Sequence, residues 1–196
     1  MKRVLLLEGP RGVGKSTLLL EAMGPCAGRA GGFMTLRLPG ENRRGFCHVK
    51  PSELQTPTGG ELRGDEKGLF LMRDENGVTR FDDVLLTHTL PMLEDIASHP
   101  FAVLDEIGGL ELTLPPFHDA LYRAIDQPVP LLGVLKCREN SQTLGRREEA
   151  FCDYRREYEA FRSFLENHGE VEIVSVQSVN DGIRQRLALW LEAHDG

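Results

Sequence analysis

The chain has 196 residues, of which 40% are hydrophobic and 27% are charged, a composition typical of a globular protein that forms one domain over residues 1–196. Its formal net charge of −7 argues against a broad nucleic-acid-binding surface, because phosphate backbones are held by basic surfaces. The apolar run near the N-terminus is too short for a signal peptide, and no later stretch has the length and apolar character of a membrane span. We therefore expect a cytoplasmic protein with neither a membrane nor a nucleic acid as partner.

The first part of the chain begins with a strand and a helix and continues with hairpins. Residues 4–7 form a continuous apolar run, which predicts a parallel strand buried on both faces, and residues 17–23 predict a helix that Gly24 and Pro25 end. From residue 31 to residue 80, short apolar stretches are separated by Gly, Pro, Asn and charged residues. We expect strands there at residues 33–38, 46–49 and 69–72, with Asn76 and Gly77 in a tight turn.

Strands and helices alternate over the rest of the chain. Residues 81–98 have helical spacing, although Pro91 must kink or break that helix. Further helices are expected at residues 117–125, 145–167 and 180–193, and further strands at residues 101–104, 129–135 and 171–176. The alternation predicts an α/β fold whose mainly parallel sheet has helices on both faces and an added β-hairpin region.

A complete phosphate-binding pattern follows the first strand. Residues 9–16 fit G-x-x-x-x-G-K-[ST]: the glycines let successive backbone N–H groups point inward, and the following helix adds its positive dipole end. Lys15 is expected to reach the β- and γ-phosphates, Ser16 to ligate Mg²⁺ and Thr17 to contact the α-phosphate. The predicted nucleotide-binding residues are Gly9, Pro10, Arg11, Gly12, Val13, Gly14, Lys15, Ser16 and Thr17.

Two acidic residues end the apolar strand at residues 101–104. In open α/β sheets the carboxyl ends of the strands bind ligands, so we expect Asp105 to hold the Mg²⁺ ion opposite Ser16. Glu106 then lies near the γ-phosphate, where a carboxylate orients and polarises an attacking water. Small-molecule kinases need room for an acceptor and usually avoid a glutamate at this position. The pair therefore favours hydrolysis, with Glu106 and Lys15 as the predicted catalytic residues.

Four segments together resemble the thermophilic-type nucleoside-triphosphatases, also called cancer-related NTPases: GPRGVGKSTL, GGFMT (31–35), RRGF (43–46) and VLDEIGGLEL (103–112). The resemblance covers nearly the whole chain and implies a RecA-like P-loop fold with Mg²⁺-dependent hydrolysis of several nucleoside triphosphates, ATP and GTP among them, and little base discrimination. It implies the same roles for Lys15, Ser16, Thr17, Asp105 and Glu106, and it adds Glu111 in a supporting role.

The chain departs from the family pattern at three motif positions, and its helix at residues 145–167 is extended relative to the family. Leu110 replaces a methionine, which is a mild change. An acidic pair and an arginine of the family are replaced by Leu36, Arg37, Leu38 and Pro39, and the family's Asn-Arg-Asp is Asn180-Asp181-Gly182 here. These changes leave open which residues contact the base and which auxiliary cation is used.

The sequence leaves several alternatives open. An auxiliary cation is supplied by Arg11, Lys136 or Arg138, and Arg146, Arg147, Arg155 and Arg156 form either a lid or, more simply, a solvated helix face. Cys137, between two basic residues, is taken as a bystander thiol, and the six histidines lack metal-ligand spacing. The alternative functions are a nucleoside or nucleotide kinase and a nucleotide-switched accessory protein whose partner the sequence does not identify.

Overall fold

The computed structural model describes residues 1–138 and 153–194, and it contains an eight-stranded sheet with the order β5-β4-β3-β2-β6-β7-β1-β8. Strands β8, β1, β7, β6 and β2 are parallel, whereas β2, β3, β4 and β5 are antiparallel. The strands are β1 (Val4–Glu8), β2 (Ala30–Pro39), β3 (Arg44–Val49), β4 (Leu69–Asp74), β5 (Gly77–Arg80), β6 (Phe101–Ile107), β7 (Leu131–Leu135) and β8 (Val171–Ser175).

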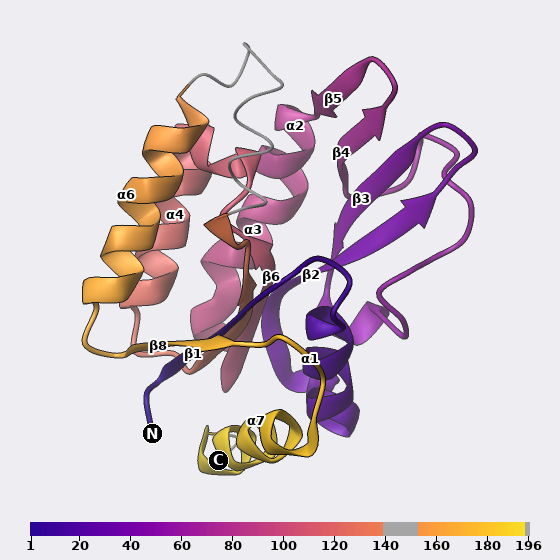
Figure 1. Cartoon of the computed structure of the whole chain (residues 1–196). Helices are drawn as coiled ribbons and strands as arrows, with labels where there is room; N and C mark the ends of the chain where they lie inside the picture. Colours follow the sequence, from indigo (N-terminus) through magenta and orange to yellow (C-terminus); the bar gives the residue numbers. More distant parts are fainter. Residues whose placement is uncertain (139–152, 195–196) are drawn as a thin grey trace.

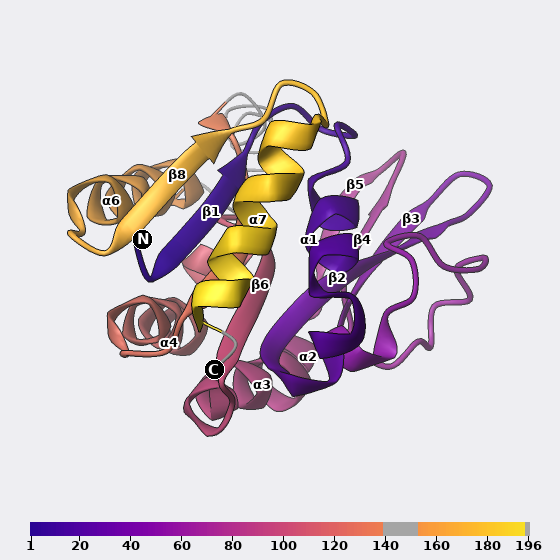
Figure 2. The same cartoon turned by 90° about the horizontal axis from the view of Figure 1, so that it is seen from below.

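Helices cover both faces of the parallel strands (Figures 1 and 2). The two helices on one face are α1 (Lys15–Met23) and α7 (Asp181–His194). The other face is covered by α3 (Leu90–Glu94), α4 (Pro115–Asp126) and α6 (Tyr154–Asn167). Shorter helical turns are η1 (Gly24–Arg29), η2 (Pro51–Glu53), α2 (Asp82–Val84), η3 (Leu85–Thr89), η4 (Asp95–Ser98) and η5 (Leu110–Thr113). The predicted α/β fold, with helices on both faces and a hairpin region, is confirmed.

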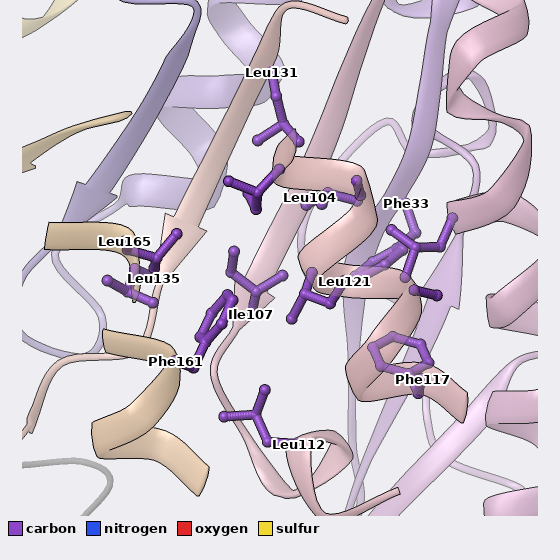
Figure 3. Packing of buried hydrophobic residues seen from close by; sticks show 14 of the residues in the cluster. Phe33, Leu104, Ile107, Leu112, Phe117, Leu121, Leu131, Leu135, Phe161 and Leu165 are labelled. Atoms are coloured by element: carbon purple, nitrogen blue, oxygen red, sulfur yellow. The ribbon is translucent and has the colours of Figure 1, made fainter. Parts of the chain in front are cut away.

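The side chains of β1 alternate between two hydrophobic cores. Val4 and Leu6 belong to the core under α4 and α6, whereas Leu5 and Leu7 belong to the core under α1 and α7. This alternation follows from the two-residue period of a strand, and it explains why the run has no polar position. Figure 3 shows the first core, in which Phe161 of α6 and Leu121 of α4 pack on Ile107 and Leu135 of the sheet.

Strand β2 changes its partner halfway along. Its first residues, 30–33, pair with β6 in parallel, whereas residues 34–39 pair with β3 in the antiparallel direction. The second half of β2 therefore diverges from β6 and continues into the hairpins at the edge of the molecule (Figure 1). Arg37 of this half and Glu106 near the end of β6 both line a cavity beside the loop that joins β1 to α1.

Two sequence expectations are refined by the structure. The helix at residues 81–98 is interrupted as Pro91 requires, because a π-helical turn, η3, precedes α3 and a 3-10 turn, η4, follows it. The helix at residues 145–167 is confirmed from Tyr154 to Asn167, and its part before residue 153 lies outside the described residues. Within the described part of the chain, no helix combines the length and apolar character needed to cross a membrane.

Candidate functional site

The loop between β1 and α1 is shaped by glycines with positive φ angles. Gly9 has a φ of 155° and Gly14, the residue before α1, a φ of 97°. A Cβ atom added to Gly9 would lie 2.0 Å from the carbonyl oxygen of Val176, so this position requires glycine for its space as well as its conformation. The loop is thus packed tightly against the chain that follows β8.

Lys15, the first residue of α1, bends back over this loop. Its Nζ donates hydrogen bonds to the carbonyl oxygens of Gly9 and Pro10, both at 2.8 Å. Burial lowers the pKa of Lys15, and the nearby Cys137, Glu106 and Asp105 oppose this shift. The loop therefore combines an ammonium group with a helix N-terminus, the two components of an anion-binding site.

Asp105 lies at the bottom of the site and is completely buried. Its Oδ1 accepts a hydrogen bond from Ser16 Oγ at 2.9 Å, and its Oδ2 accepts one from the backbone N–H of Thr35 at 3.2 Å. Burial, reinforced by the negative charge of Glu106, raises the pKa of Asp105 to about 7. This carboxyl group joins α1, β2 and β6 at the predicted position opposite Ser16.

Glu106 occupies an unusual backbone conformation. Its φ angle is 60°, in the left-handed region, and no other non-glycine residue of the described ranges has a positive φ. The register between β6 and β7 shifts between Leu104 and Ile107, so a bulge turns the Glu106 side chain toward the loop. Such a conformation costs about 1–3 kcal/mol and is typically retained at functional positions.

Three basic residues surround the Glu106 carboxylate. Arg37 forms an ion pair with its Oε1, and the Nζ of Lys136 donates a hydrogen bond to its backbone carbonyl oxygen. Burial alone would raise the pKa of Glu106, but the positive charges of Lys136, Arg37 and Arg11 together lower it. The carboxylate therefore remains ionised beside a neighbouring acid whose pKa is raised.

A cavity of about 170 Å³ lies in front of these groups. Lys15, Ser16 and Thr17 line it from the loop and α1, and Glu106 and Lys136 line it from the ends of β6 and β7. Its opposite wall comes from the antiparallel part of the molecule, through Arg37, Pro57 and Thr58. The main predicted residues are thus brought together, although Pro10 and Val13 of the loop do not line this cavity.

The structure distinguishes the three candidate cations. Arg11 and Lys136 line the cavity. Arg138 does not line it. Its Nη2 lies 3.4 Å from Oε2 of Glu159 and 4.0 Å from Oε2 of Glu166, both on α6. Together with Cys137 it lines a neighbouring cavity. Its proposed role as an auxiliary cation is therefore not supported by its position, since Lys136 lines the cavity whereas Cys137 and Arg138 line the neighbouring one.

Other predicted residues lie further from the cavity. Glu111 is buried, and its Oε1 accepts a hydrogen bond from the backbone N–H of Gly109 at 2.6 Å, which holds the loop after Glu106. Asn180 caps α7, because its Oδ1 accepts a hydrogen bond from the N–H of Ile183 at 3.1 Å, and it does not line the cavity. Asn180, Asp181 and Gly182 therefore form the start of α7.

The arginine-rich helix supports the site from behind. Tyr154 Oη donates to the carbonyl oxygen of Gly108 at 2.8 Å, and Tyr158 Oη donates to that of Lys136 at 2.7 Å. The aromatic side of α6 is thus buried packing that holds the loops after β6 and β7. Arg156 is exposed and ion-paired with Asp153 and Glu157, as on a solvated face. Arg155 is also exposed, and Arg146 and Arg147 lie outside the described residues.

Arg37 is the site residue that sequence reasoning missed. In the sequence it is only a departure from the family pattern, and no local motif marks it. The structure shows why it reaches the site: along a strand, residues two apart share a face, so Arg37 lies on the same face as Thr35, whose N–H and Oγ1 both contact Asp105. Elsewhere, no cluster of three or more His, Cys, Asp or Glu residues suited to a metal occurs in the described ranges.

Most of the chain is similar to known proteins. The chain matches the model of the NTPase family over residues 4–152. It is 26% identical over 199 aligned residues to the nucleoside-triphosphatase THEP1 of Natranaerobius thermophilus, with 96% of each chain covered.

Two solved structures share the fold. The crystal structure of THEP1 from the hyperthermophile Aquifex aeolicus superposes with a TM-score of 0.60 at 16% identity, covering 98% of this chain and 99% of that one. The solution structure of a human cancer-related nucleoside triphosphatase gives a TM-score of 0.52 at 21% identity, covering 98% and 97% of the two chains. Because the family model matches about three quarters of the chain and the fold agrees with these relatives, this chain belongs to the NTPase family and is a hydrolase with a P-loop fold.

Proposed function

We propose that this protein hydrolyses nucleoside triphosphates to the diphosphate and phosphate, depends on Mg²⁺ and discriminates little between bases. The observation that carries the proposal is the convergence of Lys15, Ser16, Glu106 and Lys136 on one cavity, with Asp105 beneath it. The name of the relative from Natranaerobius, a nucleoside-triphosphatase aligned over nearly its full length, supports the same activity.

Ser16, at the end of the loop, and Asp105, opposite it, suit a magnesium ion. Ser16 Oγ and Asp105 Oδ1 are 2.9 Å apart, and both are oxygen donors of the kind that Mg²⁺ prefers. Asp105 is buried and anionic above a pKa of about 7, so a divalent cation beside it would favour the charged carboxylate. When bound, the ion neutralises charge on the β- and γ-phosphates and holds them for attack.

The proposal assigns activation of the attacking water to Glu106. Its carboxylate faces the cavity that Lys15 also lines, and its lowered pKa keeps it ionised at neutral pH. An ionised carboxylate accepts a hydrogen bond from water and orients its oxygen toward phosphorus. Lys15 and the backbone N–H groups of the loop stabilise the negative charge of the transferring phosphoryl group.

The residues that line the cavity support weak base discrimination. Its lining comes from the loop, three acidic or basic side chains and a few apolar residues, all near the expected phosphates. One well-made hydrogen bond to a base is worth about 1–3 kcal/mol, or roughly 5- to 150-fold in affinity. In the absence of such a bond, we expect kcat/KM for ATP, GTP and CTP to agree within about tenfold.

The proposal is tested by phosphate release from ATP, GTP and CTP, with Mg²⁺ and with a chelator. We expect Glu106→Gln to lower kcat by about 10²- to 10⁴-fold while nucleotide binding persists, and Lys15→Ala to weaken nucleotide binding itself. Unchanged turnover in Glu106→Gln would show that Glu106 does not activate the water. Faster phosphate transfer to a nucleoside or nucleoside monophosphate than to water would instead identify a kinase.

A further inference from the structure

We propose that Arg37 binds the γ-phosphate and thereby couples Glu106 to the presence of a triphosphate. Its guanidinium is paired with the Glu106 carboxylate. In the proposed step it transfers to the γ-phosphate, which leaves the carboxylate free to accept a hydrogen bond from water. This inference rests on the proposed function, since it assigns a residue to the same reaction.

The backbone of Arg37 is fixed on both sides. On one side it pairs with Phe46 of β3. On the other side its N–H donates to the carbonyl oxygen of Pro57 and its own carbonyl oxygen accepts from the N–H of Gly59, both at 2.9 Å. Arg37 therefore enters the cavity from a rigid strand, and a change of partner by its guanidinium needs rotation of the side chain alone.

The side chain of Arg37 is 36% exposed, and its head lies in the same cavity as Lys15. Lys15 donates to two loop carbonyl oxygens, and Lys136 donates to the carbonyl oxygen of Glu106. Arg37 instead holds the carboxylate that the reaction needs. A triphosphate in the loop places a second anion near this guanidinium, and planar guanidinium groups bind phosphate and carboxylate oxygens in the same forked geometry.

The γ-phosphate competes well because it carries more negative charge than one carboxylate. In the hydrolytic step the water oxygen forms a bond to the γ-phosphorus while the bond to the β,γ-bridging oxygen breaks, and that electron pair leaves on the diphosphate. The water proton passes to Glu106 and then to solvent, and Arg37 keeps its own protons throughout. Once phosphate has left, the guanidinium returns to Glu106. In the diphosphate complex the Glu106 carboxylate is therefore again paired with Arg37.

This proposal predicts a selective loss in Arg37→Gln. With Mg²⁺ present, calorimetry should show an affinity for ADP within about threefold of the wild type, and an affinity for a non-hydrolysable ATP analogue weakened about tenfold or more. Phosphate release should fall by about 10²-fold, as for removal of one transition-state donor. Arg37→Lys should retain part of the analogue affinity because it keeps the charge, and it replaces the glutamine variant if that variant does not fold.

Arg44→Gln is the matched control. Arg44 is an exposed arginine of β3 that does not line the cavity, so its variant should keep wild-type affinities and turnover. A second comparison uses Glu106→Gln, in which Arg37 loses its anionic partner. This variant should bind the analogue several-fold more tightly than the wild type, and Glu106→Gln combined with Arg37→Gln should lose that gain.

Equal weakening of ADP and analogue in Arg37→Gln, or unchanged analogue affinity with lowered turnover, would overturn the inference. Equal weakening would show that Arg37 binds all nucleotides alike and does not select the γ-phosphate. Unchanged analogue affinity with lowered turnover would show that Arg37 only positions Glu106. Faster turnover in Arg37→Gln would also overturn the inference, because Arg37 would then only inhibit hydrolysis by pairing with Glu106. If the wild type fails to release phosphate, the proposed function fails instead, and the two binding comparisons still report separately on Arg37.

Discussion

The parallel and antiparallel parts of the sheet contribute to the cavity in different ways. The parallel part supplies Lys15, Ser16, Asp105 and Glu106, each at the end of a buried strand or in the loop and helix that follow one. The antiparallel part supplies Arg37, Pro57 and Thr58, from a strand interior and a connecting segment. The chemistry is thus concentrated in the parallel part, whereas the antiparallel part forms the opposite wall and contributes one charge.

The two parts also differ in how well they tolerate substitutions. The strands of the parallel part are packed between two cores, and their ends hold the loop at fixed positions. The antiparallel strands β4 and β5 are only half-buried beyond Phe70. Substitutions in the parallel part therefore affect both stability and the cavity, whereas many substitutions in the hairpins affect neither.

The largest contrast is expected between two glycines. Gly9→Ala places a Cβ atom 2.0 Å from the carbonyl oxygen of Val176 and should lower the free energy of unfolding by about 3 kcal/mol or more, with loss of nucleotide binding. Gly60 lies in the antiparallel part with open space around its Cβ position, so Gly60→Ala should be nearly neutral. Urea denaturation measures both, and similar losses in the two variants would contradict the comparison.

A smaller effect is expected from His48 in the antiparallel part, which makes the free energy of unfolding depend on pH. Its ring is buried between Phe33 and Phe70, and its Nδ1 lies 3.1 Å from Thr89 Oγ1. Burial, with help from the charges of Lys136 and His88, lowers the pKa of His48 well below its ordinary value. Below about pH 6.5 the unfolded chain therefore binds a proton that the folded protein does not.

The stability contributed by neutral His48 is present above about pH 6.5 and is lost as the pH falls. The slope of this loss approaches at most about 1.4 kcal/mol per pH unit. His48→Gln should reduce this slope, and His99→Gln should not, because His99 lies near the surface beside Asp95. Equal slopes in the wild type and His48→Gln would show that His48 stays titratable in the folded protein.

The smallest effect concerns the bulge at Glu106, where β6 and β2 separate. Replacing Glu106 by glycine or by alanine removes the same ion pair, but only alanine keeps the cost of a left-handed φ angle. Glu106→Gly should therefore be about 1 kcal/mol more stable than Glu106→Ala. Denaturation of the two variants tests this difference, and a more stable alanine variant would mean that the strand relaxes its φ angle.

Much of the parallel part follows directly from the sequence. The apolar runs predict β1, β6 and β7, and the pattern at residues 9–16 together with Asp105 and Glu106 predicts which strand ends meet. Local patterns suffice there because buried strands and glycine-rich loops are specified by neighbouring residues. The conformation of Glu106 was not predicted, because it depends on the register between β6 and β7.

The antiparallel wall was less predictable. The place of Arg37 depends on the change of partner by β2 and on the pairing of residue 37 with the segment at residues 57–59. Those contacts join residues distant in the sequence, and no local pattern marks them. Lys136 and Arg138 illustrate the same limit. Both follow β7, but only the structure shows that Lys136 lines the cavity and that Arg138 pairs with Glu159 of α6.

The position of β1 between β7 and β8 has a consequence for how the protein is made. The first strand of the chain pairs Val4 with Leu131 on one side and with Val171 on the other. During synthesis at about 5–20 residues per second, β1 therefore remains without its partners for several seconds, while the hairpins of β3, β4 and β5 already have theirs. Such distant pairing slows folding, so the phosphate-binding loop is expected to form late, after the wall that faces it.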